Sequence, residues 1–158
     1  DMKMKRWFAL ALAALLAVGL LAGCGGSGAV SLNDDKVEAF LQESGIDATV
    51  EADDSLTRAA RDMAQTLSGQ DYAQIDASMS TIRQEIAGQA GVGRLAACAV
   101  YGDSYRPSTP LGALTRYEET LASCIRMEGN GDGAYKAAVV RFTSRDGMKL
   151  VLYVAAEA

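Results

Sequence analysis

The sequence predicts an α+β fold, an α-β-α sandwich in which an antiparallel sheet has helices on both faces. Two observations lead to this prediction. Four segments carry apolar residues at helical spacing, and residues 136–156 have the pattern of a β-hairpin. In the second strand of that hairpin, apolar residues occupy both alternating positions, so both faces of the sheet are expected to be covered.

Three helices are predicted in the first half of the chain. The first lies between the N-cap candidates Asn33 to Asp35 and Gly45, and the third covers about residues 71–87 before Gly88. The second begins at Asp53 or Asp54 and ends at Gly69. Its apolar stripe consists of Leu56, Ala59, Ala60, Met63, Ala64 and Leu67. The small residues of this stripe indicate close backbone packing.

A strand, a helix and the hairpin are predicted in the second half. Residues 94–101 are small and apolar between two glycines, as in a strand that is buried on both faces. Thr109 and Pro110 then start a fourth helix. The hairpin strands cover 136–143 and 148–156, with Asp146 and Gly147 as the turn.

The N-terminus resembles the signal peptide of a bacterial lipoprotein precursor. Three basic residues precede an apolar run from Trp7 to Leu21, and the sequence Leu-Ala-Gly-Cys ends at Cys24. The apolar run is shorter than the roughly 20 residues of a spanning helix. The resemblance implies cleavage before Cys24 and a lipid on its sulfur; the alternative is an ordinary secretory signal in which Cys24 is incidental.

We therefore expect a signal peptide over 1–23, a lipidated Cys24 with a flexible tether to residue 32, and one domain over 33–158. The protein would be exported and held on the outer side of the bacterial cell membrane. Without residues 1–23 the chain keeps 12 Lys and Arg against 19 Asp and Glu, a net charge of −7. This charge argues against nucleic acid and against an anionic membrane surface as the main partner.

The domain has two cysteines, Cys98 and Cys124, and an exported protein can form disulfides. They either bond to each other or stay as buried thiols that pack like small apolar residues. The chain has no histidine, and the two cysteines lack the spacing of a zinc site. We expect no metal and no cofactor.

Three segments resemble the CAP domain of the cysteine-rich secretory and pathogenesis-related proteins. Residues 52–72 are similar to the first long helix of that family, 97–114 to its buried strand followed by a Thr-Pro helix start, and 134–155 to its closing hairpin. The resemblance implies a central cleft in which two His and one or two Glu often hold a metal ion. At the matching positions this chain has Gln74 or Ile75, Ala97 and Ile125.

The resemblance therefore implies a degenerate CAP domain without metal binding or acid-base chemistry. Because Cys98 and Cys124 neighbour two of these cleft positions, it also implies a disulfide that closes the former metal site. Side chains that would line the cleft are Tyr72, Tyr101, Asp103, Ser104, Tyr105 and Arg126. Ordinary packing is the alternative role for at least half of them.

The expected function is non-catalytic binding of a peptide, glycan or lipid in the cell envelope or outside it. The alternative is a metal-independent envelope hydrolase or peptidase. Its candidate residues are Asp103, Glu118, Glu119 and Arg126. No histidine is present to activate Ser104, which argues against a serine hydrolase. A third interpretation is a structural spacer or assembly subunit.

Overall fold

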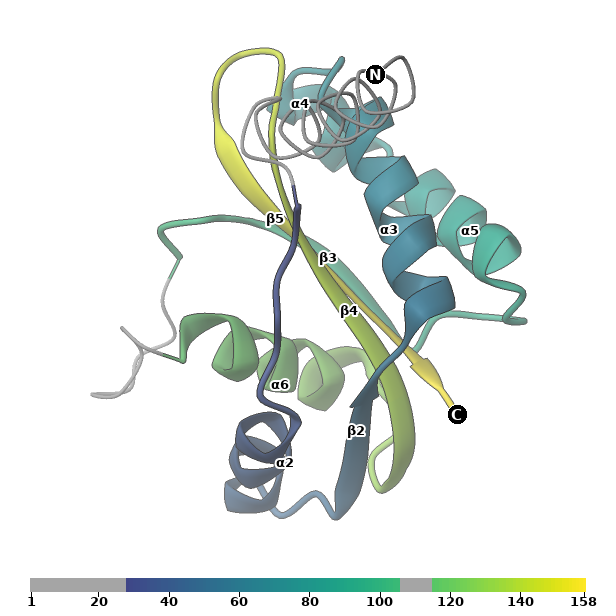
Figure 1. Ribbon diagram of the computed structural model, residues 1–158, viewed down its shortest axis with the longest axis vertical. Coiled ribbons are helices and arrows are strands. Elements are labelled where there is room, and N and C mark those ends of the chain that lie inside the picture. Colours follow the sequence, from purple (N-terminus) through teal and green to yellow (C-terminus); the bar gives the residue numbers. More distant parts are fainter. Residues whose placement is uncertain (1–27, 106–114) are drawn as a thin grey trace, which may run out of the picture.

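The computed structural model describes residues 28–105 and 115–158. It has the predicted α+β architecture, with one sheet between two layers of helices (Figure 1). The strands are β1 (Gly28–Ala29), β2 (Ala48–Ala52), β3 (Ala97–Gly102), β4 (Gly133–Thr143) and β5 (Lys149–Glu157). The helices are α2 (Asp34–Glu43), α3 (Asp54–Leu67), α4 (Tyr72–Ala77), α5 (Met79–Ala90) and α6 (Arg116–Glu128).

The sheet has the order β1-β4-β5-β3, and β2 also pairs with β4. The pairs between β4 and β5 and between β3 and β5 are antiparallel, as predicted. β2 was not predicted, and it runs parallel to β4, so the sheet is not antiparallel throughout. A stretch of five residues with one buried valine, Val50, is too short a signal to separate a strand from a loop.

The tether predicted over 24–32 is shorter than expected at its C-terminal end. Gly28 and Ala29 pair with Arg141 and Val140 of β4, and the Val30 N–H donates to the Val139 carbonyl at 2.8 Å. Pairing between main chains needs no particular side chain. A glycine-rich segment can therefore form hydrogen bonds with the main-chain groups of β4 that β2 leaves unpaired. Cys24 and the apolar run from Trp7 to Leu21 lie outside the described residues.

Alternating residues of β4 and β5 pack into two separate cores, which confirms that both sheet faces are covered. α3, α4 and α5 cover one face, and α2 and α6 cover the other (Figure 1). The first face receives Ala138, Val140, Phe142, Leu150, Leu152, Val154 and Ala156. The second receives Tyr135, Ala137, Val139, Val151, Tyr153 and Ala155. We call these sides the α3 face and the α6 face.

The first two predicted helices are confirmed together with their caps. Asn33 accepts a hydrogen bond from the Lys36 N–H at the start of α2, and Asp53 accepts one from the Leu56 N–H (2.9 Å) at the start of α3. Every residue of the predicted α3 stripe is buried. The stripe packs mainly on β4 and α5, so its alanines let the helix lie close to the sheet.

The third predicted helix is two helices, α4 and α5, separated at Ser78. The Ser78 hydroxyl donates to the Gln74 carbonyl at 2.7 Å, which satisfies the end of α4 locally. α5 also continues through Gly88, which was predicted to end it. Gly91 ends α5 in the left-handed conformation (φ 70°), and the Val92 N–H reaches back to the Ala87 carbonyl.

The remaining elements agree with the sequence pattern. The hairpin of β4 and β5 is present, with Gly147 at φ 84° in its turn, and β3 covers most of the predicted strand. The predicted start of the fourth helix at Thr109 and Pro110 lies outside the described residues. In the part of the chain that the structure describes, no helix has the length and hydrophobicity needed to cross a membrane.

Candidate functional site

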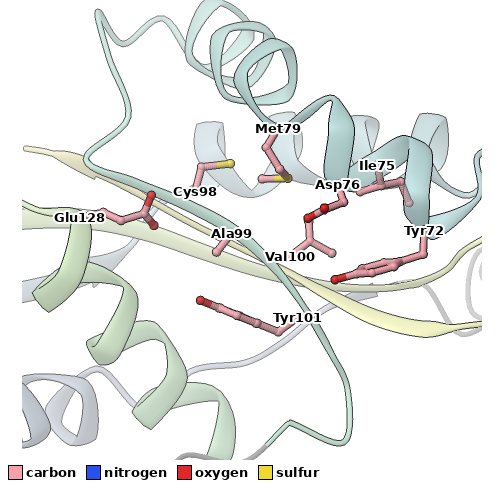
Figure 2. Close-up of a pocket in the computed structure, with 9 residues that line it drawn as sticks. All are labelled: Tyr72, Ile75, Asp76, Met79, Cys98, Ala99, Val100, Tyr101 and Glu128. Carbon is pink, nitrogen blue, oxygen red and sulfur yellow. The ribbon is translucent and has the colours of Figure 1, made fainter.

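A groove with a volume of about 280 Å³ runs along β3 between α4 and the C-terminal end of α6 (Figure 2). β3 is the last strand in the sheet order, so within residues 28–105 and 115–158 one of its edges has no neighbouring strand. The groove is lined by Tyr72, Ile75, Asp76, Met79, Cys98, Ala99, Val100, Tyr101 and Glu128. The floor is therefore an edge strand, and the walls are helices from both faces of the sheet.

The wall on the α3 face is α4, and the hairpin turn holds this short helix in place. The Arg145 guanidinium donates to both carboxylate oxygens of Asp71 (3.0 and 2.9 Å), and the Tyr72 N–H donates to Asp146 (3.2 Å). The hydrogen bond from Arg145 lowers the pKa of Asp71. With its N-terminus fixed in this way, α4 directs Tyr72 and Ile75 toward the sheet.

β3 divides its side chains between the two faces. Cys98 and Val100 pack on the α3 face, and Ala99 and Tyr101 pack on the α6 face. Figure 2 shows Tyr72 and Tyr101 on opposite sides of the strand. The Tyr101 ring also stacks on Tyr105, with 4.8 Å between ring centroids. The groove thus has one aromatic residue on each side of its floor.

An ion pair crosses one end of the groove. Arg83 of α5 pairs with Glu128 of α6, and its guanidinium also donates to the Cys98 carbonyl at 3.4 Å. Asp76, on the opposite wall, is exposed and has no ion-pair partner among the described residues. The groove therefore carries an acidic group that the described part of the chain does not neutralise.

The structure has both cysteines as free, buried thiols, without the bond that the CAP resemblance implied. The alternation of β3 places Cys98 in the core of the α3 face, whereas Cys124 of α6 lies in the core of the α6 face. Burial raises the pKa of each thiol to about 12. These are unreactive, protonated side chains that behave as packing residues, which was the second alternative from the sequence.

Asp103, predicted to line the cleft, instead joins a polar cluster at the end of β3. Its carboxylate accepts hydrogen bonds from Tyr117 (2.6 Å), Arg116 (3.3 Å) and Arg141 (3.1 Å). Burial alone would raise the pKa of this carboxyl, but the Tyr117 hydrogen bond and the two arginines outweigh it and hold the pKa below its ordinary value. The cluster ties β3 to α6 and β4.

Of the other predicted cleft residues, some lie at the groove or beside it and the rest lie outside it. Tyr72 and Tyr101 meet at the groove, and Tyr105 lies beside it through its stacking on Tyr101. Ser104 is exposed beyond the end of β3. Arg126 is also exposed, and it donates to the Ser123 hydroxyl on its own helix at 3.4 Å. Neither of these two lines the groove.

The positions that would form a CAP-type cleft lie on opposite sides of the sheet. Ile75 is buried in the core of the α3 face, while Ala97 and Ile125 are buried together in the core of the α6 face. Gln74 instead bonds to the Asp71 N–H and to Arg145. These residues do not form a single cavity, so the groove along β3 is not the cleft that the resemblance implied.

Two of the candidate residues for hydrolysis, Glu118 and Glu119, lie in the first turn of α6. Glu118 accepts a hydrogen bond from the Asn33 N–H at 3.2 Å, and Glu119 is buried in the first turn of α6. Both acidic groups sit where a helix N-terminus favours negative charge. Among residues 28–105 and 115–158, no three Cys, Asp or Glu side chains lie close enough to hold a metal ion.

Sequence reasoning missed five groove residues: Asp76, Met79, Ala99, Val100 and Glu128. Met79 and Val100 were predicted to lie on a buried helix face and in a buried strand, but nothing indicated that they border an open edge. Only the strand order reveals that edge, because it makes β3 terminal. Asp76 and Glu128 are ordinary acidic residues of helix ends, without a sequence signal.

Comparison of the chain with protein-family models, with curated proteins and with solved structures gives no match. The CAP resemblance and the lipoprotein signal therefore stay predictions from the sequence.

Proposed function

We propose that this chain is an exported lipoprotein, anchored through Cys24 to the outer side of a bacterial membrane, whose domain binds a ligand without catalysis. One observation carries the binding role. The groove along β3 combines an open strand edge with Tyr72 on one side and Tyr101 on the other. Aromatic side chains with a polar tip are enriched at binding surfaces because they offer apolar area and a hydrogen bond together.

The chemistry of the groove supports binding rather than turnover. Its titratable groups are two carboxylates, two tyrosines and a thiol, and the thiol stays protonated because burial raises its pKa. Of the carboxylates, Glu128 is held by Arg83. A nucleophile with an adjacent base is not among the residues that line the groove.

Binding is tested with purified cell envelopes and the full chain carrying Cys24→Ser, so that a lipid does not contribute. We expect co-sedimentation, and we expect Tyr72→Ala to weaken it about tenfold, since truncation of a tyrosine that acts as a binding hot spot costs more than about 1 kcal/mol. Met127→Ala is the matched control, because Met127 is 70% exposed on α6 and does not line the groove. Equal co-sedimentation of the two variants would contradict the proposal.

A further inference from the structure

The edge of β3 that faces the groove carries main-chain groups that have no partner in the described part of the chain. The Asp103 N–H donates to the Lys149 carbonyl at 2.9 Å, in register with the β3 and β5 pairing. In an antiparallel pair, opposite residues alternate between bonded and non-bonded pairs. Ala99 and Tyr101 therefore bond to β5, and Cys98, Val100 and Gly102 direct their N–H and C=O groups away from it.

The contacts of these outward groups agree with that alternation. The Cys98 carbonyl accepts from Arg83, and the Gly102 carbonyl accepts from the Tyr105 N–H at 2.9 Å. Val100 lies between Cys98 and Gly102 in the strand. Its N–H and its C=O have no partner among the described residues. Val100 is also half-buried in the groove rather than freely solvated. An unpaired edge of this kind is a template for another extended chain.

We propose that the groove binds a short extended peptide, which pairs with β3 at Val100 as an added strand. This inference rests on the proposed binding function and names its ligand class. Main-chain hydrogen bonds would supply affinity, and side chains alternating along the peptide would contact the two walls. Because Arg83 already occupies the Cys98 carbonyl, the free stretch is short, and it fits a segment of about three to five residues.

The charge of the groove selects the kind of peptide. Asp76 lies on the same side of β3 as Val100 (Figure 2), and it has no ion-pair partner in the described part of the chain. A Lys or Arg of the bound segment would pair with this carboxylate. The net charge of the whole chain, −5, also favours association with a basic segment. Tyr72 and Tyr101 would contact the peptide side chains next to the basic one.

The test is selection of ligands from a random 12-residue peptide library displayed on phage, with the full chain in detergent as bait. We expect enriched peptides with a basic residue among alternating β-branched or aromatic ones. Each selected peptide is then resynthesised with one N-methyl group at successive residues. Loss of binding should alternate along the peptide, because only every second N–H of an added strand faces β3.

The same contacts are also tested by substitutions in the protein, at Val100 and at Asp76. Val100→Pro removes the outward N–H, and proline is tolerated at this position of an edge strand. We expect it to weaken binding about tenfold, and clearly more than Val100→Thr, which changes the same side chain but keeps the N–H. Asp76→Lys should weaken binding of the basic peptides by a similar factor. Its control is Asp62→Lys, since Asp62 is exposed on α3 outside the groove.

Three results would overturn the inference: no enriched peptide, N-methyl effects without alternation, or unchanged binding to Asp76→Lys. If Val100→Pro unfolds, as circular dichroism would reveal, Asp76→Lys and the N-methyl series still decide the question. Failure of the proposed function has a different signature, which is envelope binding that does not depend on Tyr72. Envelope binding that depends on Tyr72 without any selected peptide would assign the groove to a glycan or lipid.

Discussion

Asp103 shows how one carboxylate can join three elements. Its side chain is only 12% exposed, and it accepts hydrogen bonds from Tyr117, Arg116 and Arg141. Hydrogen bonds to a charged group contribute about 1.5 to 3 kcal/mol each, less where the group is partly solvated. The CAP resemblance implied that this residue lines a binding cleft. Its contacts instead give it a structural role.

We predict that Asp103→Asn lowers the free energy of unfolding by about 2 kcal/mol at neutral pH. Because the folded-state pKa of Asp103 is lowered from 3.8, its contribution is present above that value and is lost as the pH falls through the folded-state pKa. The difference between variant and wild type should therefore shrink toward pH 3. Urea unfolding at both pH values measures it, with Asp62→Asn as a control that changes little.

The two thiols predict a loss of stability at high pH. An unfolded cysteine titrates near 9.0, whereas burial raises the pKa of Cys98 and Cys124 to about 12 in the folded protein. The unfolded state then releases protons that the folded state keeps, so the free energy of unfolding falls as the pH rises from about 9 to about 12. Replacing both cysteines by alanine should make this fall less steep than in the wild type.

Alkylation with iodoacetamide gives an independent measurement of the same thiols. Folded protein at pH 8 should react at neither Cys98 nor Cys124, and addition of urea without reductant should expose both. Mass spectrometry counts the modified sites. A protein that stays unmodified in urea until a reductant is added would have the disulfide that the CAP resemblance implied.

At the scale of elements, α5 contains one glycine that a residue with a side chain could replace, Gly88, and ends at one that needs to be glycine, Gly91. Gly88 is exposed within the helix, and a Cβ placed there meets nothing within 4 Å. Gly91 also has free space around it, but its φ of 70° is unfavourable for any residue with a side chain. The helix thus continues through one glycine and ends at the other.

We predict that Gly88→Ala stabilises the protein by about 1 kcal/mol, because alanine has the higher helix propensity and the less flexible unfolded chain. Gly91→Ala should destabilise it by about 1 kcal/mol, because the left-handed conformation is strained for alanine. Thermal and urea unfolding of the pair of variants measure both changes. If the helix ended at Gly88 as the sequence suggested, Gly88→Ala would bring no gain.

The same elements show what the sequence could predict. Periodicity identified α2, α3, α6 and the hairpin, because burial of one helix face or of alternating strand residues leaves a repeating pattern. It did not reveal the break at Ser78, which depends on a single hydroxyl bonded to a local carbonyl. It also missed β1 and β2, which depend on pairing with a partner distant in the sequence.

The groove was predictable only in part. Tyr72 and Tyr101 were predicted to line a cleft, but the expected cleft combined residues from both faces of the sheet. The alternation of β3 separates them, and the terminal position of β3 creates the site. Strand order is set by long-range contacts, so a reading of local patterns does not determine which strand lies at the edge.

For the whole molecule, the proposed lipid anchor at Cys24 predicts where the protein is found in a cell. Cells grown with an alkyne analogue of palmitate should label the wild-type chain in the membrane fraction, since the predicted modification attaches lipid to Cys24. Cys24→Ser should remove the label and release the protein from the membrane. Cys98→Ser is the control, because Cys98 is buried in the folded domain. Label that persists in Cys24→Ser would contradict the predicted anchor.

The pairing of β1 with β4 would set the orientation of such an anchored domain. Gly28 follows Cys24 by four residue steps, a reach of at most about 14 Å, and β1 then fixes the chain to one border of the sheet. β3 forms the opposite border. With Cys24 in the bilayer, the border with the groove would therefore face away from the lipid surface. A soluble partner could approach it without meeting the membrane.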